Sequence, residues 1–142
     1  MTKEQISSYR SKVIEKFINI EWLLNCIISQ HYFSQVNRDF IFEVLYDDQC
    51  SFGLKRNIFL KVIGDVDNRK VEDLNRLNKI RNLFAHCDSQ DPNMPGKIID
   101  PKNREAQIDF EQLYQEFVRL APRVVQYLLP LFTGRGGMIS ES

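Results

Sequence analysis

Hydrophobic residues recur at helical spacing along most of the chain, and glycine and proline are scarce before residue 90. The spacing predicts a long first helix over residues 2–33. Its apolar stripe consists of Ile6, Tyr9, Val13, Phe17, Ile20, Leu24 and Ile27. A stripe of this kind is typical of a helix that buries one face in a protein core.

Three further helices follow in the pattern. A short one fits residues 38–46. Ser51 is placed to cap a third helix that reaches residue 63, where Gly64 stops it. Asp67 or Asn68 is placed to cap a fourth helix that continues to about residue 86. These signals divide the first two thirds of the chain into helices joined by short connections.

The pattern changes after residue 86. Residues 87–96 are predicted to be a loop, because two prolines and a glycine fall within a short polar stretch. Residues 97–109 indicate two short strands around a turn at 101–104. A last helix begins near residue 109, and Pro122 and Pro130 are expected to bend or end it. Its apolar residues are Phe110, Leu113, Phe117, Leu120, Val124 and Leu128.

The fold class predicted from these elements is all-α. We expect a helical bundle of about five helices, with a small β-hairpin inserted before the last helix. The 142 residues fit one compact domain, predicted to span residues 1–132, with a flexible C-terminal tail at 133–142.

Composition narrows the class of protein. Three cysteines (Cys26, Cys50 and Cys87) with no CxxC pair argue against a disulfide framework and a cysteine-based zinc site. The polar N-terminal stretch and the lack of a long apolar run predict a cytoplasmic protein with no membrane segment. Nineteen basic and nineteen acidic residues cancel, so any contact with RNA must come from a local cluster.

The fourth predicted helix has an unusual polar face. On a helical projection, Asn68, Asn75, Asn78, Asn82 and His86 form a stripe without a permanent charge. An uncharged polar stripe suits a surface that another chain or a ligand covers, because lone charges are costly to desolvate. The alternative is that these asparagines are ordinary helix-surface residues.

Charged and polar residues also fall within apolar faces. Arg81 projects into the apolar arc of the fourth helix, and Glu21 and Asn25 project into the apolar face of the first. A buried carboxylate needs a partner, and Arg81 is the expected partner of Glu21. That pair is either structural or orients the guanidinium toward a phosphate. Alternatively, Arg81 lies over the core edge with its head group in solvent.

The segment from Arg81 to His86, with Asn82 second, resembles the signature of the HEPN superfamily. That signature is an arginine, usually followed by a polar residue, and a histidine after four to six intervening positions. The resemblance extends over roughly residues 5–132, since HEPN domains are helical bundles with the motif late in a long helix. It implies metal-independent endoribonuclease activity at a composite dimer site, often in toxin–antitoxin or defence systems. Some members are inactive interaction domains.

The expected site follows from the motif and the chemistry of RNA cleavage. Arg81, His86 and Asn82 are the predicted catalytic residues, Glu21 and Asn25 support them, and no metal or cofactor is expected. Asn75 and Asn78 are predicted to bind RNA. Histidine can act as base or acid near neutral pH, and arginine binds phosphate bidentately.

Arg81 and His86 are five positions apart, so on one helix their side chains point about 140° away from each other. A homodimer is therefore expected, because it can bring two copies of each residue into one site. Other expected partners are RNA and an antitoxin protein such as a nucleotidyltransferase. His31 is predicted to be a partly buried packing residue, which leaves no Ser–His–Asp set. The alternatives left open are an inactive HEPN-like scaffold that binds a partner protein or nucleotide, and a plain helical adaptor.

Overall fold

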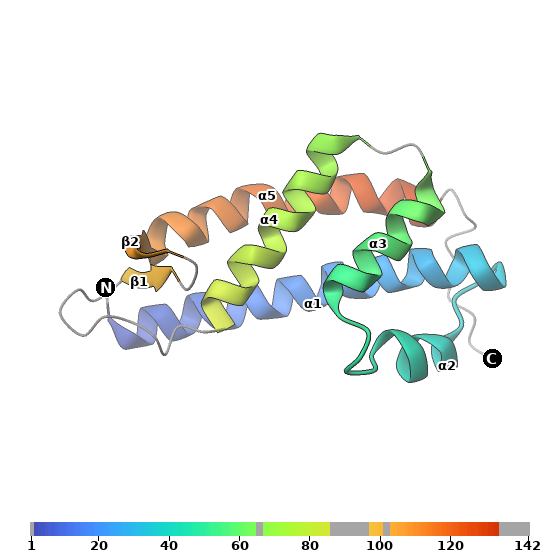
Figure 1. Ribbon diagram of the computed structural model, residues 1–142, viewed down its shortest axis with the longest axis horizontal. Helices are drawn as coiled ribbons and strands as arrows, with labels where there is room; N and C mark the ends of the chain where they lie inside the picture. Colours follow the sequence, from blue (N-terminus) through green and yellow to red (C-terminus); the bar gives the residue numbers. More distant parts are fainter. Residues whose placement is uncertain (1, 65–66, 86–96, 101–102, 134–142) are drawn as a thin grey trace. The chain divides into compact units, whose positions relative to one another are not determined.

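The chain is an all-α protein in the computed structural model, which describes residues 2–64, 67–85, 97–100 and 103–133 (Figure 1). The helices are α1 (Lys3–Phe33), α2 (Arg38–Phe40), α3 (Phe52–Ile63), α4 (Asn68–Ala85) and α5 (Phe110–Thr133). A π-helical segment, η1 (Ile41–Leu45), continues directly from α2. The predicted helices are therefore confirmed to within a few residues. Among the described helices, none has an apolar stretch that would reach across a membrane.

Local signals explain where these helices begin and end. The Oγ of Ser51 accepts a hydrogen bond from the backbone N–H of Leu54 at 3.1 Å, which caps α3 as predicted. Gly64 ends α3 at a φ of 80°, a positive value that glycine adopts without the steric penalty of a side chain. The Oδ1 of Asp67 accepts from the N–H of Arg69 at 3.0 Å and caps α4.

The last helix begins where it was predicted and continues through both of its prolines. Asp109 caps α5 by accepting a hydrogen bond from the N–H of Gln112 at 3.1 Å. The helix then runs through Pro122 and Pro130 to Thr133, so of the two expected effects, bending or ending the helix, neither proline ends it. Each proline removes one helical N–H donor, but the long buried face of α5 keeps the segment helical.

A two-stranded antiparallel sheet precedes α5. It pairs β1 (Lys97–Asp100) with β2 (Asn103–Asp109), and the register is irregular between Ile99 and Asp100. The predicted loop at 87–96, the first two residues of the predicted turn (101–102), and residues 134–142 of the predicted tail lie outside the described residues.

The chain divides into two compact units. The first unit comprises Met1–Ile18 and Asp73–Pro122. Within it, the rings of Phe84 on α4 and Phe110 on α5 lie 5.4 Å apart. Its buried apolar side chains are Ile6, Val13, Phe17, Leu74, Leu77, Ile80, Leu83, Phe84, Phe110, Leu113, Phe117, Leu120 and Ala121. Most of these were expected from the helical stripes.

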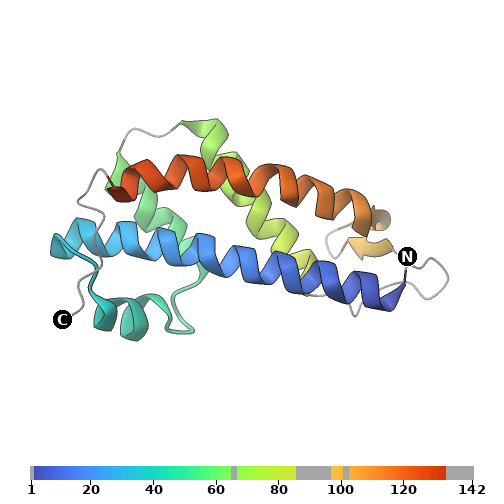
Figure 2. The ribbon, with the colours of Figure 1, turned by 180° about the vertical axis from the view of Figure 1, so that it is seen from behind.

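The second unit comprises Asn19–Glu72 and Arg123–Ser142. Figure 2 shows α2 and η1 beside the last turns of α1, where the Oγ of Ser29 accepts a hydrogen bond from the N–H of Asn37 at 2.6 Å. Phe59 on α3 packs edge-on against Tyr127 on α5. The buried apolar side chains are Ile20, Leu24, Cys26, Ile27, Ile28, Val36, Ile41, Leu45, Phe52, Phe59, Val62, Val124 and Leu128.

Candidate functional site

Arg81 occupies the last turns of α4, in the first unit, next to buried core residues. Ile80 and Phe84 on the same helix are fully buried, whereas Arg81 is half-buried. The carbon Cζ of its guanidinium lies 4.8 Å from the ring centroid of Phe17 on α1, which is a cation–π distance. The core edge therefore holds the arginine head group against an aromatic face.

A hydrogen bond within α4 also orients this guanidinium. The Nη2 of Arg81 donates to the Oδ1 of Asn78 at 2.9 Å, three residues earlier on the helix. The Nε of Arg81 is buried and has no hydrogen-bond partner within the described ranges. A buried N–H without a partner is costly, and an anion is a favourable acceptor for it.

The neighbouring cation on α4 is paired differently. Arg76 donates from Nη2 to the Oε1 of Glu116 on α5 at 2.8 Å, and a second hydrogen bond from Nε completes a bidentate pair. The hydrogen bond to Arg76 lowers the pKa of Glu116 below its usual value. In contrast, no ion pair to a carboxylate is found for Arg81 in the part of the chain that the structure describes. Unlike that of Arg76, its charge therefore remains available to an added anion.

The predicted polar stripe is accessible where it is described. Asn82 and Asn68 are exposed, and Asn75 and Asn78 are half-buried. His86, the predicted catalytic base or acid, lies outside the described residues. Of the predicted site, the structure thus brings Arg81 together with Asn78, on the helix that also carries Asn82.

Glu21 and Asn25 belong to a different cluster, in the second unit. Glu21 forms an ion pair with Lys55 on α3 and not with Arg81, the partner expected from the sequence. The Nζ of Lys55 lies 2.6 Å from the Oε1 of Glu21. The side chain of Lys55 is 2% exposed and that of Glu21 is 19% exposed. The expectation that Glu21 is ion-paired is confirmed, but its side chain is only partly buried and its predicted partner is wrong.

Tyr46 and Asn25 complete this cluster. The ammonium of Lys55 lies 4.7 Å from the ring centroid of Tyr46. Burial, followed by the charge of Glu21, raises the pKa of Tyr46, and the nearby Asn25 amide opposes that rise. Asn25 is fully buried as predicted, yet neither its Nδ2 nor its Oδ1 meets the geometry of a hydrogen bond with a described residue.

Lys55 is the residue that the sequence analysis missed. Phe52 lies three positions before Lys55, Phe59 lies four positions after it, and Val62 lies seven positions after it. These three apolar residues are buried. Helical spacing alone therefore places Lys55 on the apolar face of α3. His31 was also misjudged, because it is exposed at the end of α1 rather than partly buried.

Comparisons with known proteins give no relative whose function could suggest the function of this chain. No family model, curated protein or solved structure matches the chain.

Proposed function

We propose that this protein is a metal-independent endoribonuclease of the HEPN type. The observation that carries the proposal is the state of Arg81. Its guanidinium is half-buried against Phe17, is oriented by Asn78, and has no carboxylate partner among the described residues. Such a preorganised cation is suited to bind a phosphate, and it begins the segment that resembles the HEPN signature.

In the proposed reaction, the RNA supplies its own nucleophile. One histidine, His86, accepts the proton of the 2′-hydroxyl while the O2′–P bond forms and the P–O5′ bond breaks. The partner's His86 gives a proton to the departing O5′. Arg81 binds the phosphoryl oxygens and stabilises their charge in the transition state. The products are a 2′,3′-cyclic phosphate and a 5′-hydroxyl.

The proposed active form is a homodimer, because one chain has a single histidine in the motif and the reaction uses both an acid and a base. Asn82 is exposed on α4 and is proposed to orient His86 or to bind the ribose. Asn75 is proposed to contact RNA. The hairpin before α5 accords with the HEPN resemblance. A cytoplasmic toxin or defence effector, held in check by an antitoxin such as a nucleotidyltransferase, is the proposed setting.

A cleavage assay with paired variants tests the proposal. Purified protein should cut single-stranded RNA in EDTA. Arg81→Ala and His86→Ala should each lower the rate by about a hundredfold or more. The matched controls are Arg76→Ala, which removes a carboxylate-paired cation from the same helix, and His31→Ala, which removes an exposed histidine.

Both control variants should retain activity. If wild-type protein is inactive, or if Arg81→Ala and Arg76→Ala cleave equally well, the ribonuclease proposal fails. An inactive HEPN-like domain that binds a partner would then take its place.

A further inference from the structure

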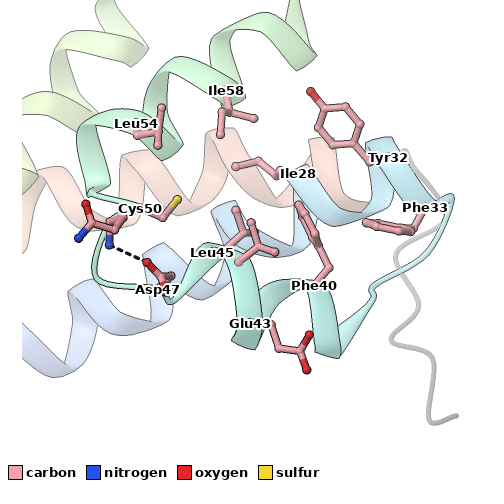
Figure 3. A pocket seen from close by; sticks show the side chains of 12 residues that line it. Ile28, Tyr32, Phe33, Phe40, Glu43, Leu45, Asp47, Cys50, Leu54 and Ile58 are labelled. Atoms are coloured by element: carbon pink, nitrogen blue, oxygen red, sulfur yellow. Dashed lines mark hydrogen bonds between the residues drawn. The ribbon is translucent and has the colours of Figure 1, made fainter.

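The second unit contains an open apolar groove that the proposed ribonuclease chemistry does not use. It has a volume of about 630 Å³. Its walls come from the end of α1, from α2 and η1, from the connection at residues 47–50, and from α3 (Figure 3). Ile28, Phe40, Leu45 and Ile58 are among the apolar side chains that line it. The groove is therefore formed by consecutive elements within residues 28–58.

The rim of the groove exposes large apolar side chains. Tyr32 is 59% exposed, Phe33 44%, Val44 49% and Leu54 46%, and all four line the groove. Clustered apolar exposure of this kind is unusual on the surface of a protein that acts alone. A small molecule inside the groove would leave these rim residues in water. An occupant that covers them must extend over several helices.

Among the described residues that line the groove, the two charged ones are both acidic. Glu43 and Asp47 are exposed, and Figure 3 shows the Glu43 carboxylate directed away from the apolar side chains. The Oδ1 of Asp47 accepts a hydrogen bond from the N–H of Gln49 at 2.8 Å, which fixes that carboxylate at the rim. This charge favours a basic occupant and repels nucleic acid and anionic lipid.

We propose that this groove binds an amphipathic helical segment of a partner protein, with apolar side chains on one face and lysine or arginine beside them. Helix-in-groove recognition uses apolar anchors at positions i, i+3 or i+4, and i+7. The apolar walls receive those anchors, and Glu43 and Asp47 pair with the flanking basic residues. This binding function is independent of the ribonuclease proposal.

A designed peptide pair tests the groove directly. The probe is a fluorescein-labelled peptide of about 15 residues made of leucine and lysine, with leucines on one helical face. The matched peptide replaces each lysine with glutamate. Fluorescence anisotropy with the full chain should give a Kd at least about tenfold lower for the lysine peptide.

Two variants assign the binding to the apolar wall. Leu54→Gln removes a groove residue in the first turn of α3, where a glutamine is compatible with the helix. Leu129→Gln is the matched control, since Leu129 is 48% exposed on α5 and does not line the groove. Leu54→Gln should raise the Kd about tenfold, and the control should change it by less than about twofold.

A charge-removing double variant, Glu43→Gln with Asp47→Asn, tests the acidic rim. It should raise the Kd by about threefold or more and make binding less sensitive to salt. Equal affinity for both peptides, or equal effects of the two leucine variants, would overturn the proposal. Two other results would also overturn it. One is that the chain self-associates and Leu54→Gln abolishes this, and the other is that the chain binds phosphatidylglycerol vesicles and Leu54→Gln abolishes that binding. Those two outcomes would assign the groove to a second copy of the chain or to lipid.

Discussion

The ammonium of Lys55 lies 2.6 Å from the carboxylate of Glu21, in a place where the lysine side chain is only 2% exposed. A lysine so deeply buried is tolerated because the carboxylate offsets its charge and the Tyr46 ring lies 4.7 Å away. The two partners are not equivalent. Glu21 retains 19% exposure, so water can still reach it if the lysine is removed.

This asymmetry predicts unequal effects of mutation on the free energy of unfolding. Glu21→Ala should cost about 3 kcal/mol, because it leaves a buried cation without a partner. Lys55→Met should cost only about 1 kcal/mol, and the double variant Glu21→Leu/Lys55→Met less than that. Urea denaturation measures all three. Lys61→Met, an exposed lysine of the same helix, should change stability by under about 0.5 kcal/mol.

If Glu21→Ala and Lys61→Met had the same small effect on unfolding, the ion pair would not be buried. A double variant as unstable as Glu21→Ala would show that the surrounding packing, rather than the stranded charge, accounts for the loss.

The Arg76–Glu116 pair makes stability depend on pH. The hydrogen bond from Arg76 lowers the pKa of Glu116 in the folded protein below its usual 4.5. The pair therefore stabilises the fold at neutral pH, and the contribution is lost as the pH falls below 4.5 through the folded pKa. At pH 7, Glu116→Gln should unfold more easily than wild type by about 1 kcal/mol.

The difference between wild type and Glu116→Gln should shrink as the pH falls toward 3. Urea denaturation at several pH values measures it. A difference that stays constant from neutral to acidic pH would contradict the pairing.

Asn78 is predicted to position Arg81, because its Oδ1 accepts the hydrogen bond from Nη2. Asn78→Ala should lower the cleavage rate about tenfold without lowering thermal stability, because alanine favours a helix more than asparagine does. Asn68→Ala, at the exposed start of α4, is the control and should leave cleavage unchanged. Equal rates for the two variants would remove Asn78 from the site.

Helical spacing was enough to locate the helices and most of the core, because each helix buries one continuous stripe. It also placed Asn25 correctly, since a polar residue within an apolar stripe has to be buried. The partner of Glu21 could not be found in this way. Arg81 and Lys55 both project toward apolar faces, and helical projection does not say which elements pack together. α5 continues through Pro122 because packing along its length outweighs a local signal.

The groove was also beyond sequence reasoning. Tyr32, Val44 and Leu54 each look like ordinary core or surface residues in their own helices. They line one surface only because α2 and η1 turn back beside the end of α1. Such a tertiary arrangement has no local signature.

If the active site is composite, one inactive chain should impair the whole dimer. A mixed dimer of one wild-type and one His86→Ala chain should retain well under half of the activity of the wild-type dimer. It is made by refolding two differently tagged chains together and purifying the dimer that carries both tags. Activity proportional to the number of wild-type chains would mean that each chain acts alone.

The origin of the nucleophile gives the most direct test of the ribonuclease account. A single-stranded RNA with one mapped cleavage site is compared, in EDTA, with the same RNA carrying one 2′-deoxynucleotide 5′ to that bond. We expect the all-RNA substrate to be cut to a 2′,3′-cyclic phosphate and a 5′-hydroxyl, and the 2′-deoxy substitution to abolish cleavage there. Cleavage of both substrates, with 5′-phosphate ends, would contradict it.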